Sequence, residues 1–182
     1  MATWGQTTDG SGVEALSGNL KGSIGQFTVA GQQLDSMVVR FASGTGSVRG
    51  AVYEKADGDP NGASLVEDLG TETASGASEV TFTSSTNPTL TQNNYLFLIV
   101  KTDVSGIELD DDTSSDGDLA LGIHFCNSED SDEGVAFPAT MSDPTFLRSA
   151  DVGTLYINHS AAPAGGSIAP KVHFYRQQQG VG

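Results

Sequence analysis

Cysteine and positive charge are both scarce in this sequence. One cysteine, Cys126, stands among 182 residues, so no disulfide bond can form within the chain. Its neighbours in "HFCNS" are typical of a strand end, where a lone cysteine serves as a small core side chain. Only 8 Lys and Arg stand against 23 Asp and Glu, a formal net charge of −15. A negative surface repels phosphate groups and releases no counterions, which excludes direct binding to nucleic acid.

Long apolar runs and catalytic motifs are absent from the sequence. No run approaches the roughly 20 residues of a membrane span. The first residues, "MATWGQTTDGSGVEAL", lack the basic region and apolar segment of a signal peptide, so we expect a soluble protein made in the cytoplasm. His124, His159 and His173 are too far apart for zinc spacing, and no G-x-S-x-G occurs. We therefore expect no catalytic residue, no metal, no cofactor and no enzymatic activity.

Short alternating apolar segments make up most of what is present. Apolar residues at every second position predict half-buried strands, and 23 glycines supply the turns between them. The clearest alternating sets are Phe27 and Val29; Met37, Val39 and Phe41; Val48, Gly50 and Val52; Val80 and Phe82; and Leu119, Leu121, Ile123 and Phe125. With further strands at "TLYIN" and "KVHFYRQ", the pattern predicts an all-β fold, a single antiparallel jelly-roll-like β-sandwich of about eight strands.

The segment "NYLFLIVKT" is apolar on both faces, which predicts a central strand. Leu96, Leu98 and Val100 should face one layer, and Tyr95, Phe97 and Ile99 the other. Residues 1–22 are expected to form an N-terminal arm, because the one helix-like stretch, "SGVEALSGNLKGS", is weakened by three glycines. Residues 23–182 then form the β-sandwich domain, with a long loop at 126–148 over a sheet edge or a neighbouring subunit and a C-terminal tail at 176–182.

Two acidic loops are candidates for calcium. In "DDDTSSDGDLAL", from Asp110 to Leu121, the acids do not follow EF-hand spacing, and no acid stands at the closing position. We therefore expect a solvated acidic loop at Asp110–Asp118, with a calcium site using Asp103 or Asp116 as the alternative. In "KADGDPNGAS", Asp57, Asp59 and Asn61 match the first half of a calcium loop, although ordinary turn chemistry explains them as well.

Three segments in a fixed order carry a resemblance to a known group of domains. They are "GQFTVAGQQLDSMVVRFA", "SVRGAVYEKADGDPNGASLVED" and "TLTQNNYLFLIVKTD". Their order resembles jelly-roll β-sandwich domains of bacterial extracellular proteins and phage virion proteins, over roughly residues 24–125. The resemblance implies the fold and carries no catalytic residues. Asn93 and Asn94 stand where these domains have a turn containing glycine.

These observations predict a non-enzymatic virion structural protein, a capsid decoration or cement protein on the outer surface of a phage head. The alternative is a tail fibre or baseplate adhesin, or a carbohydrate-binding module, that recognises glycans. A glycosidase with paired carboxylates ranks last. The expected partners are the major capsid protein or other virion subunits, and further copies of the chain, with a trimer expected by analogy. The residues expected at assembly contacts are Trp4, Phe137, Met141, Phe146 and Tyr175.

Overall fold

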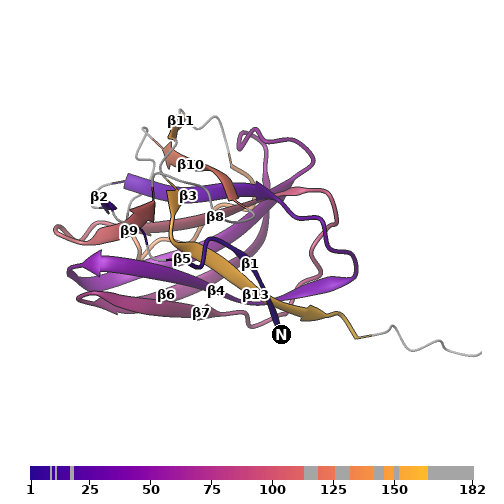
Figure 1. The fold of residues 1–182 in the computed structure, drawn as a ribbon, viewed down its shortest axis with the longest axis horizontal. Helices are drawn as coiled ribbons and strands as arrows, with labels where there is room; N and C mark the ends of the chain where they lie inside the picture. Colours follow the sequence, from indigo (N-terminus) through magenta and orange to yellow (C-terminus); the bar gives the residue numbers. More distant parts are fainter. Residues whose placement is uncertain are drawn as a thin grey trace, which may run out of the picture.

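The computed structural model describes residues 1–8, 10, 12–16, 19–112, 119–125, 132–141, 146–149 and 152–163. Within these ranges the chain forms thirteen strands and no helix (Figure 1). Every pair of neighbouring strands is antiparallel, and the strands form two sheets with an apolar core between them. The prediction of an all-β sandwich is thus confirmed. The structure divides the strands more finely than the eight that the sequence pattern predicted.

The seven-stranded sheet contains both ends of the described chain. Its strand order is β1-β13-β4-β9-β12, with β2 beside β9 and β7 beside β4. β1 and β13 run side by side next to the N-terminus (Figure 1). The bounds of the strands are β1 (Ala2–Gly5), β2 (Gly12–Ala15), β4 (Gln32–Ser43), β7 (Ser78–Thr83), β9 (Glu108–Asp112), β12 (Val152–Gly153) and β13 (Leu155–Ala161).

The six-stranded sheet has the order β11-β10-β3-β8-β5-β6. Bulges between Gly50 and Ala51 and between Val52 and Tyr53 interrupt the pairing of β5 with the edge strand β6. Such bulges increase the local twist and make an edge less able to pair with another chain. The bounds of the strands are β3 (Asn19–Gln26), β5 (Thr45–Lys55), β6 (Ser64–Ser75), β8 (Tyr95–Thr102), β10 (Leu119–Phe125) and β11 (Phe146–Ser149).

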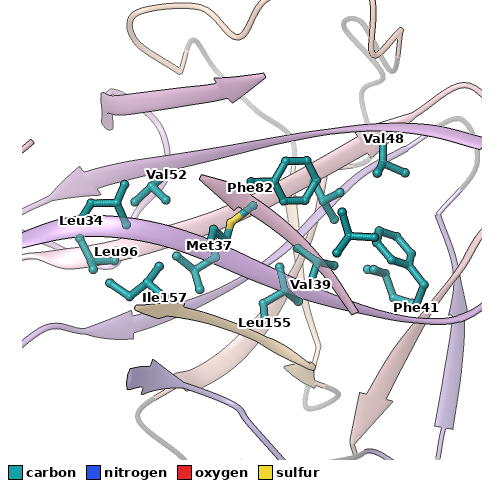
Figure 2. Close-up of a cluster of buried hydrophobic side chains, with 14 of the residues drawn as sticks. Leu34, Met37, Val39, Phe41, Val48, Val52, Phe82, Leu96, Leu155 and Ile157 are labelled. Carbon is teal, nitrogen blue, oxygen red and sulfur yellow. The ribbon is translucent and has the colours of Figure 1, made fainter. Parts of the chain in front are cut away.

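The main core lies between the two sheets and confirms the alternation read from β4, β5 and β7. Met37, Val39 and Phe41 point inward from β4 and are fully buried. Figure 2 shows them meeting side chains from both sheets, among them Phe82 of β7 and Leu96 of β8. Burying such side chains contributes about 1.5–3 kcal/mol each, so this interface is a main source of the stability of the fold.

Strand β8 is buried on both faces, as the sequence predicted. Leu96, Leu98 and Val100 belong to the main core. Phe97 and Ile99 belong to a second apolar cluster, and Tyr95 packs against it. Because the main core lies between the sheets, the second cluster lies on the outer face of the six-stranded sheet. That apolar face needs a cover, and the cover positions the candidate site described below.

Several local expectations differ from the structure. β3 ends at Gln26, so Phe27 and Val29 do not share a strand face; Phe27 is fully buried, whereas Val29 is 40% exposed. The helix-like stretch forms β2 and the start of β3, because its glycines disfavour a helix and the sheets supply pairing partners. Residues 1–22 are therefore not a separate arm where the structure describes them, since they add strands to both sheets.

The turn before β8 has an asparagine where the jelly-roll domains that the sequence resembles have a turn containing glycine. Asn93 adopts a φ of 66°, in the left-handed region. After glycine, asparagine tolerates this region best, so Asn93 can take the place of the usual glycine. The strand expected at "KVHFYRQ" and the tail at 176–182 lie outside the described residues, and so do the side chains of Leu119, Leu121, Ile123 and Phe125.

Candidate functional site

A ten-residue segment, residues 132–141, covers the outer face of the six-stranded sheet; we call it the strap. Phe137 and Met141 from the strap are 6% and 8% exposed and join the second apolar cluster. The ring of Phe137 packs edge-on against Tyr53, with 6.1 Å between ring centroids. The sequence predicted that the loop at 126–148 folds over a sheet edge or a neighbouring subunit. Residues 132–141 of this loop form backbone hydrogen bonds with Ala63 and Leu65 at the edge of the six-stranded sheet.

An ion pair on the sheet holds the first half of the strap. Arg49 of β5 and Asp68 of β6 form a salt bridge with 2.9 Å between Nη2 and Oδ2. The same carboxylate accepts a hydrogen bond from the backbone N–H of Phe137 at 2.9 Å, and Arg49 donates to the carbonyl of Glu133 at 3.1 Å. Burial alone would raise the pKa of Asp68, but hydrogen bonds from Arg49, Phe137 and Gly70 outweigh it and lower the pKa.

Backbone hydrogen bonds hold the second half of the strap at the edge of the sheet. The N–H of Met141 donates to the carbonyl of Ala63 at 3.0 Å, and the N–H of Leu65 donates to the carbonyl of Ala139 at 2.9 Å. The hydroxyl of Tyr53 donates to the carbonyl of Pro138 at 2.7 Å. Burial raises the pKa of Tyr53, and the charge of Asp68 adds to the effect, so the hydroxyl keeps its proton and remains a donor.

A buried lysine lies beneath the strap. Lys101 is 1% exposed, and its ammonium nitrogen is 4.7 Å from the centroid of the Phe137 ring. It is paired in register with Arg49 across β5 and β8, so two cations lie side by side on this face. A cation over an aromatic face is stabilised by the ring quadrupole, and the stabilisation grows when water is excluded. The strap therefore covers positive charge as well as apolar surface.

Three carboxylates meet where the strap begins. Ligand oxygens of Asp103, Asp132 and Glu133 all lie within 4.8 Å of one another, and oxygen donors of this kind suit Ca²⁺. The hydrogen bond with Glu133 and its charge raise the pKa of Asp103. Burial alone would raise the pKa of Glu133, but hydrogen bonds from Asp103 and the charge of Lys101 lower it. Asp103 is a candidate ligand of the alternative calcium site predicted from the sequence, and the structure places it beside the strap residues Asp132 and Glu133.

The first part of the predicted acidic loop is not solvated. Asp110 and Asp111 lie in β9 and are each 7% exposed. Asp110 forms a salt bridge with Arg40 of β4, with 3.1 Å between Oδ2 and Nε. The prediction of a solvated loop is therefore wrong for these two aspartates, because β9 lies inside the seven-stranded sheet. Residues 113–118 lie outside the described residues.

The calcium-like loop at Asp57–Gly62 contains a cation from the chain itself. The ammonium of Lys55 is 3.1 Å from Oδ1 of Asp57 and donates to the carbonyl of Asn61 at 2.6 Å. Backbone N–H groups of Asp59 and Asn61 donate to the carboxylates two residues earlier, which is ordinary Asx-turn chemistry. The hydrogen bond from Lys55 lowers the pKa of Asp57. The ammonium group of Lys55 thus contacts the oxygens that a metal ion in this loop would need as ligands.

The residues expected at assembly contacts have mixed placements. Trp4 is 3% exposed in the main core, with its ring edge-on to Phe27 at 5.8 Å. Phe137 and Met141 belong to the strap, and their side chains are buried in the second apolar cluster. Phe146 is in β11, but its side chain and the whole of Tyr175 lie outside the described residues. Three of the five thus already pack within their own chain, and a role for any of them in assembly stays a prediction.

Sequence reasoning missed the ion pair of Arg49 with Asp68 and the buried Lys101, because no local pattern marks them. The part of the chain that the structure describes contains no helix with the length and hydrophobicity that a membrane crossing requires.

Comparison of the chain with protein-family models, with curated proteins and with solved structures gave no match. The likeness to jelly-roll domains therefore rests on the three sequence segments and on the β-sandwich itself.

Proposed function

We propose that the chain is a structural protein of a phage particle, a decoration protein on the outer surface of the head. The order of the three quoted segments and the all-β sandwich support this assignment. The expected partners are the major capsid protein and further copies of the chain. The proposed role is non-enzymatic, since a decoration protein works by contact and by its own stability.

The distribution of charge is the observation that supports a location on the outer surface of the particle. The structure describes five lysine and arginine side chains, and each of them already has a partner within the chain. Four form ion pairs, Lys21 with Glu14, Arg40 with Asp110, Arg49 with Asp68 and Lys55 with Asp57, and Lys101 lies over Phe137. With 23 acids in the sequence, the excess charge that remains is negative. Packaged DNA would repel such a surface, whereas an outward position avoids that repulsion.

Labelling of intact, genome-filled particles with a membrane-impermeant lysine reagent tests the proposal. Lys55 should react, because its side chain is 25% exposed. Lys101, at 1% exposed, is the internal control and should react only after unfolding. Protection of Lys55 in filled particles, or absence of the chain from purified particles, would contradict the proposal. Native mass spectrometry of the isolated chain then tests the expected trimer.

A further inference from the structure

The two outer faces of the sandwich differ in what covers them. The strap covers the outer face of the six-stranded sheet, whereas the seven-stranded sheet presents exposed side chains along β7. Cross-strand register places two complete rows of uncharged residues on that second face, across β7, β4, β13 and β1. One row consists of Thr83, Ser36, Asn158 and Thr3. In a chain with 23 acids, an uncharged block of this extent is a distinct surface.

The second row contains a tyrosine on the outer face. It consists of Thr81, Val38, Tyr156 and Gly5. Tyr156 points outward, because its neighbours Leu155 and Ile157 are in the main core, and it is partly exposed. Gly5 lies opposite Tyr156 on β1 and has no side chain, so this flank of the tyrosine has no cross-strand side chain. Val38, which is paired with Tyr156 on its other flank, is 2% exposed.

We infer that this uncharged face binds a short neutral oligosaccharide, with a sugar ring stacked on Tyr156. An aromatic ring offers a flat apolar surface to the C–H groups of a sugar, and the exposed hydroxyls of Thr3, Thr81 and Thr83 offer hydrogen bonds to its hydroxyl groups. Ser36 is buried, and its hydroxyl already accepts a hydrogen bond from Nδ2 of Asn158 at 2.8 Å. Burial raises the pKa of Tyr156, and the charge of Glu79 adds to the effect, so its hydroxyl stays protonated at neutral pH. This inference goes beyond the proposed function and does not depend on it.

Area and charge both favour an oligosaccharide over a protein partner. Two rows across four strands cover roughly 250 Å², given strand spacings near 4.8 Å and about 6.7 Å between rows. A stable protein interface covers about 800 Å² on each partner. The block itself is uncharged, and Glu79 and Asp110 on either side of Arg40 border it. An anionic sugar chain would therefore meet repulsion, whereas a neutral one would not.

Nuclear magnetic resonance titration of the full chain tests this inference. The probes are the neutral tetramers cellotetraose, mannotetraose, maltotetraose and chitotetraose, and the acidic tetragalacturonate. At millimolar concentration, at least one neutral probe should shift backbone amide signals of β1, β4, β7 and β13, and tetragalacturonate should shift none. No shift with any of the four neutral probes, or shifts confined to other strands, would overturn the inference.

Variants separate stacking from a merely structural role of the tyrosine. Tyr156→Ala should weaken binding at least about tenfold, which corresponds to roughly 1.4 kcal/mol, whereas Tyr156→Phe keeps the ring and should bind within about threefold of the original chain. Thr81→Glu places a charge in the block at an exposed position and should also weaken binding. This variant tests the site if Tyr156→Ala does not fold. Thr73→Ala, on β6, is the control. Unchanged binding by a folded Tyr156→Ala or by Thr81→Glu would refute the site.

Discussion

Asp68 binds the guanidinium group of Arg49 with both carboxylate oxygens. Nε of Arg49 is 2.9 Å from Oδ1 and 3.2 Å from Oδ2, and Nη2 is 2.9 Å from Oδ2. Bidentate pairs of this kind fix geometry as well as adding energy. Asp68 also accepts the N–H of Phe137, and Arg49 also donates to the carbonyl of Glu133, so this single pair joins two strands to the strap.

Removal of the carboxylate at Asp68 should loosen the strap. Asp68→Ala leaves Arg49 without its carboxylate partner, and we expect a loss of about 2–4 kcal/mol in the free energy of unfolding, because the pair is mostly buried. Hydrogen exchange should show faster exchange at Phe137 than in the original chain. Glu72→Ala, an exposed acid of the same strand, is the control and should change little. Equal exchange at Phe137 in both variants would contradict the anchoring role.

Truncation of β8 on its inner face should be costly. Leu98 is fully buried in the main core, so Leu98→Ala removes buried apolar surface and leaves a cavity. The expected loss is about 2–5 kcal/mol in the free energy of unfolding, measured by chemical denaturation. Thr81→Ala, exposed on β7, is the matched control and should stay within about 0.5 kcal/mol of the original chain. A loss below about 1 kcal/mol at Leu98 would show that β8 is not central.

Acid should destabilise the fold partly through Glu67. Burial alone would raise the pKa of Glu67, but hydrogen bonds from Ser84, Ser85 and Thr86 outweigh it and lower the pKa. A folded pKa below the unfolded value gives stability that is present above the unfolded pKa and is lost as pH falls through the folded pKa. Stability should therefore decline below about pH 4.3, the ordinary pKa of glutamate.

The Glu67→Gln variant tests this linkage directly. The variant should have a lower free energy of unfolding than the original chain at pH 7. The difference in free energy of unfolding between the two should become smaller as pH falls toward 3. Glu72→Gln is the control, because Glu72 is exposed on the same strand, β6. A gap that stays constant over this pH range would mean that the charge of Glu67 contributes nothing to stability.

Removal of calcium should leave the fold almost unchanged. The Asp57–Gly62 loop already holds the ammonium of Lys55, and we keep the prediction that the chain needs no metal. A chelator should shift the melting temperature by less than about 2 °C, which corresponds to under about 1 kcal/mol for a chain of this length. Calorimetric titration with Ca²⁺ measures binding directly and can contradict this prediction. Saturable binding that Asp103→Asn abolishes and Asp59→Asn does not would place a metal at the strap.

The sequence by itself determined the faces of the strands with clear apolar alternation, namely β4, β5 and β7, and the two buried faces of β8. Side chains alternate between faces along a strand, so the spacing of Met37, Val39 and Phe41 already shows which way β4 faces. The apolar stretch of β8 similarly requires a cover on both sides, and the structure supplies a sheet on one side and the strap on the other. These properties are local, because they depend on residue type at adjacent positions.

Only the tertiary structure decided which charges meet. Asp110 and Arg40 are 70 residues apart in sequence, and their pairing exists because β9 lies beside β4. Asp103 and Glu133 come together because the strap crosses the sheet. Tyr156 lies within an uncharged block because β13 lies between β1 and β4. A local pattern fixes which face a side chain occupies. Strand order and loop path bring distant residues together, and no local pattern specifies either.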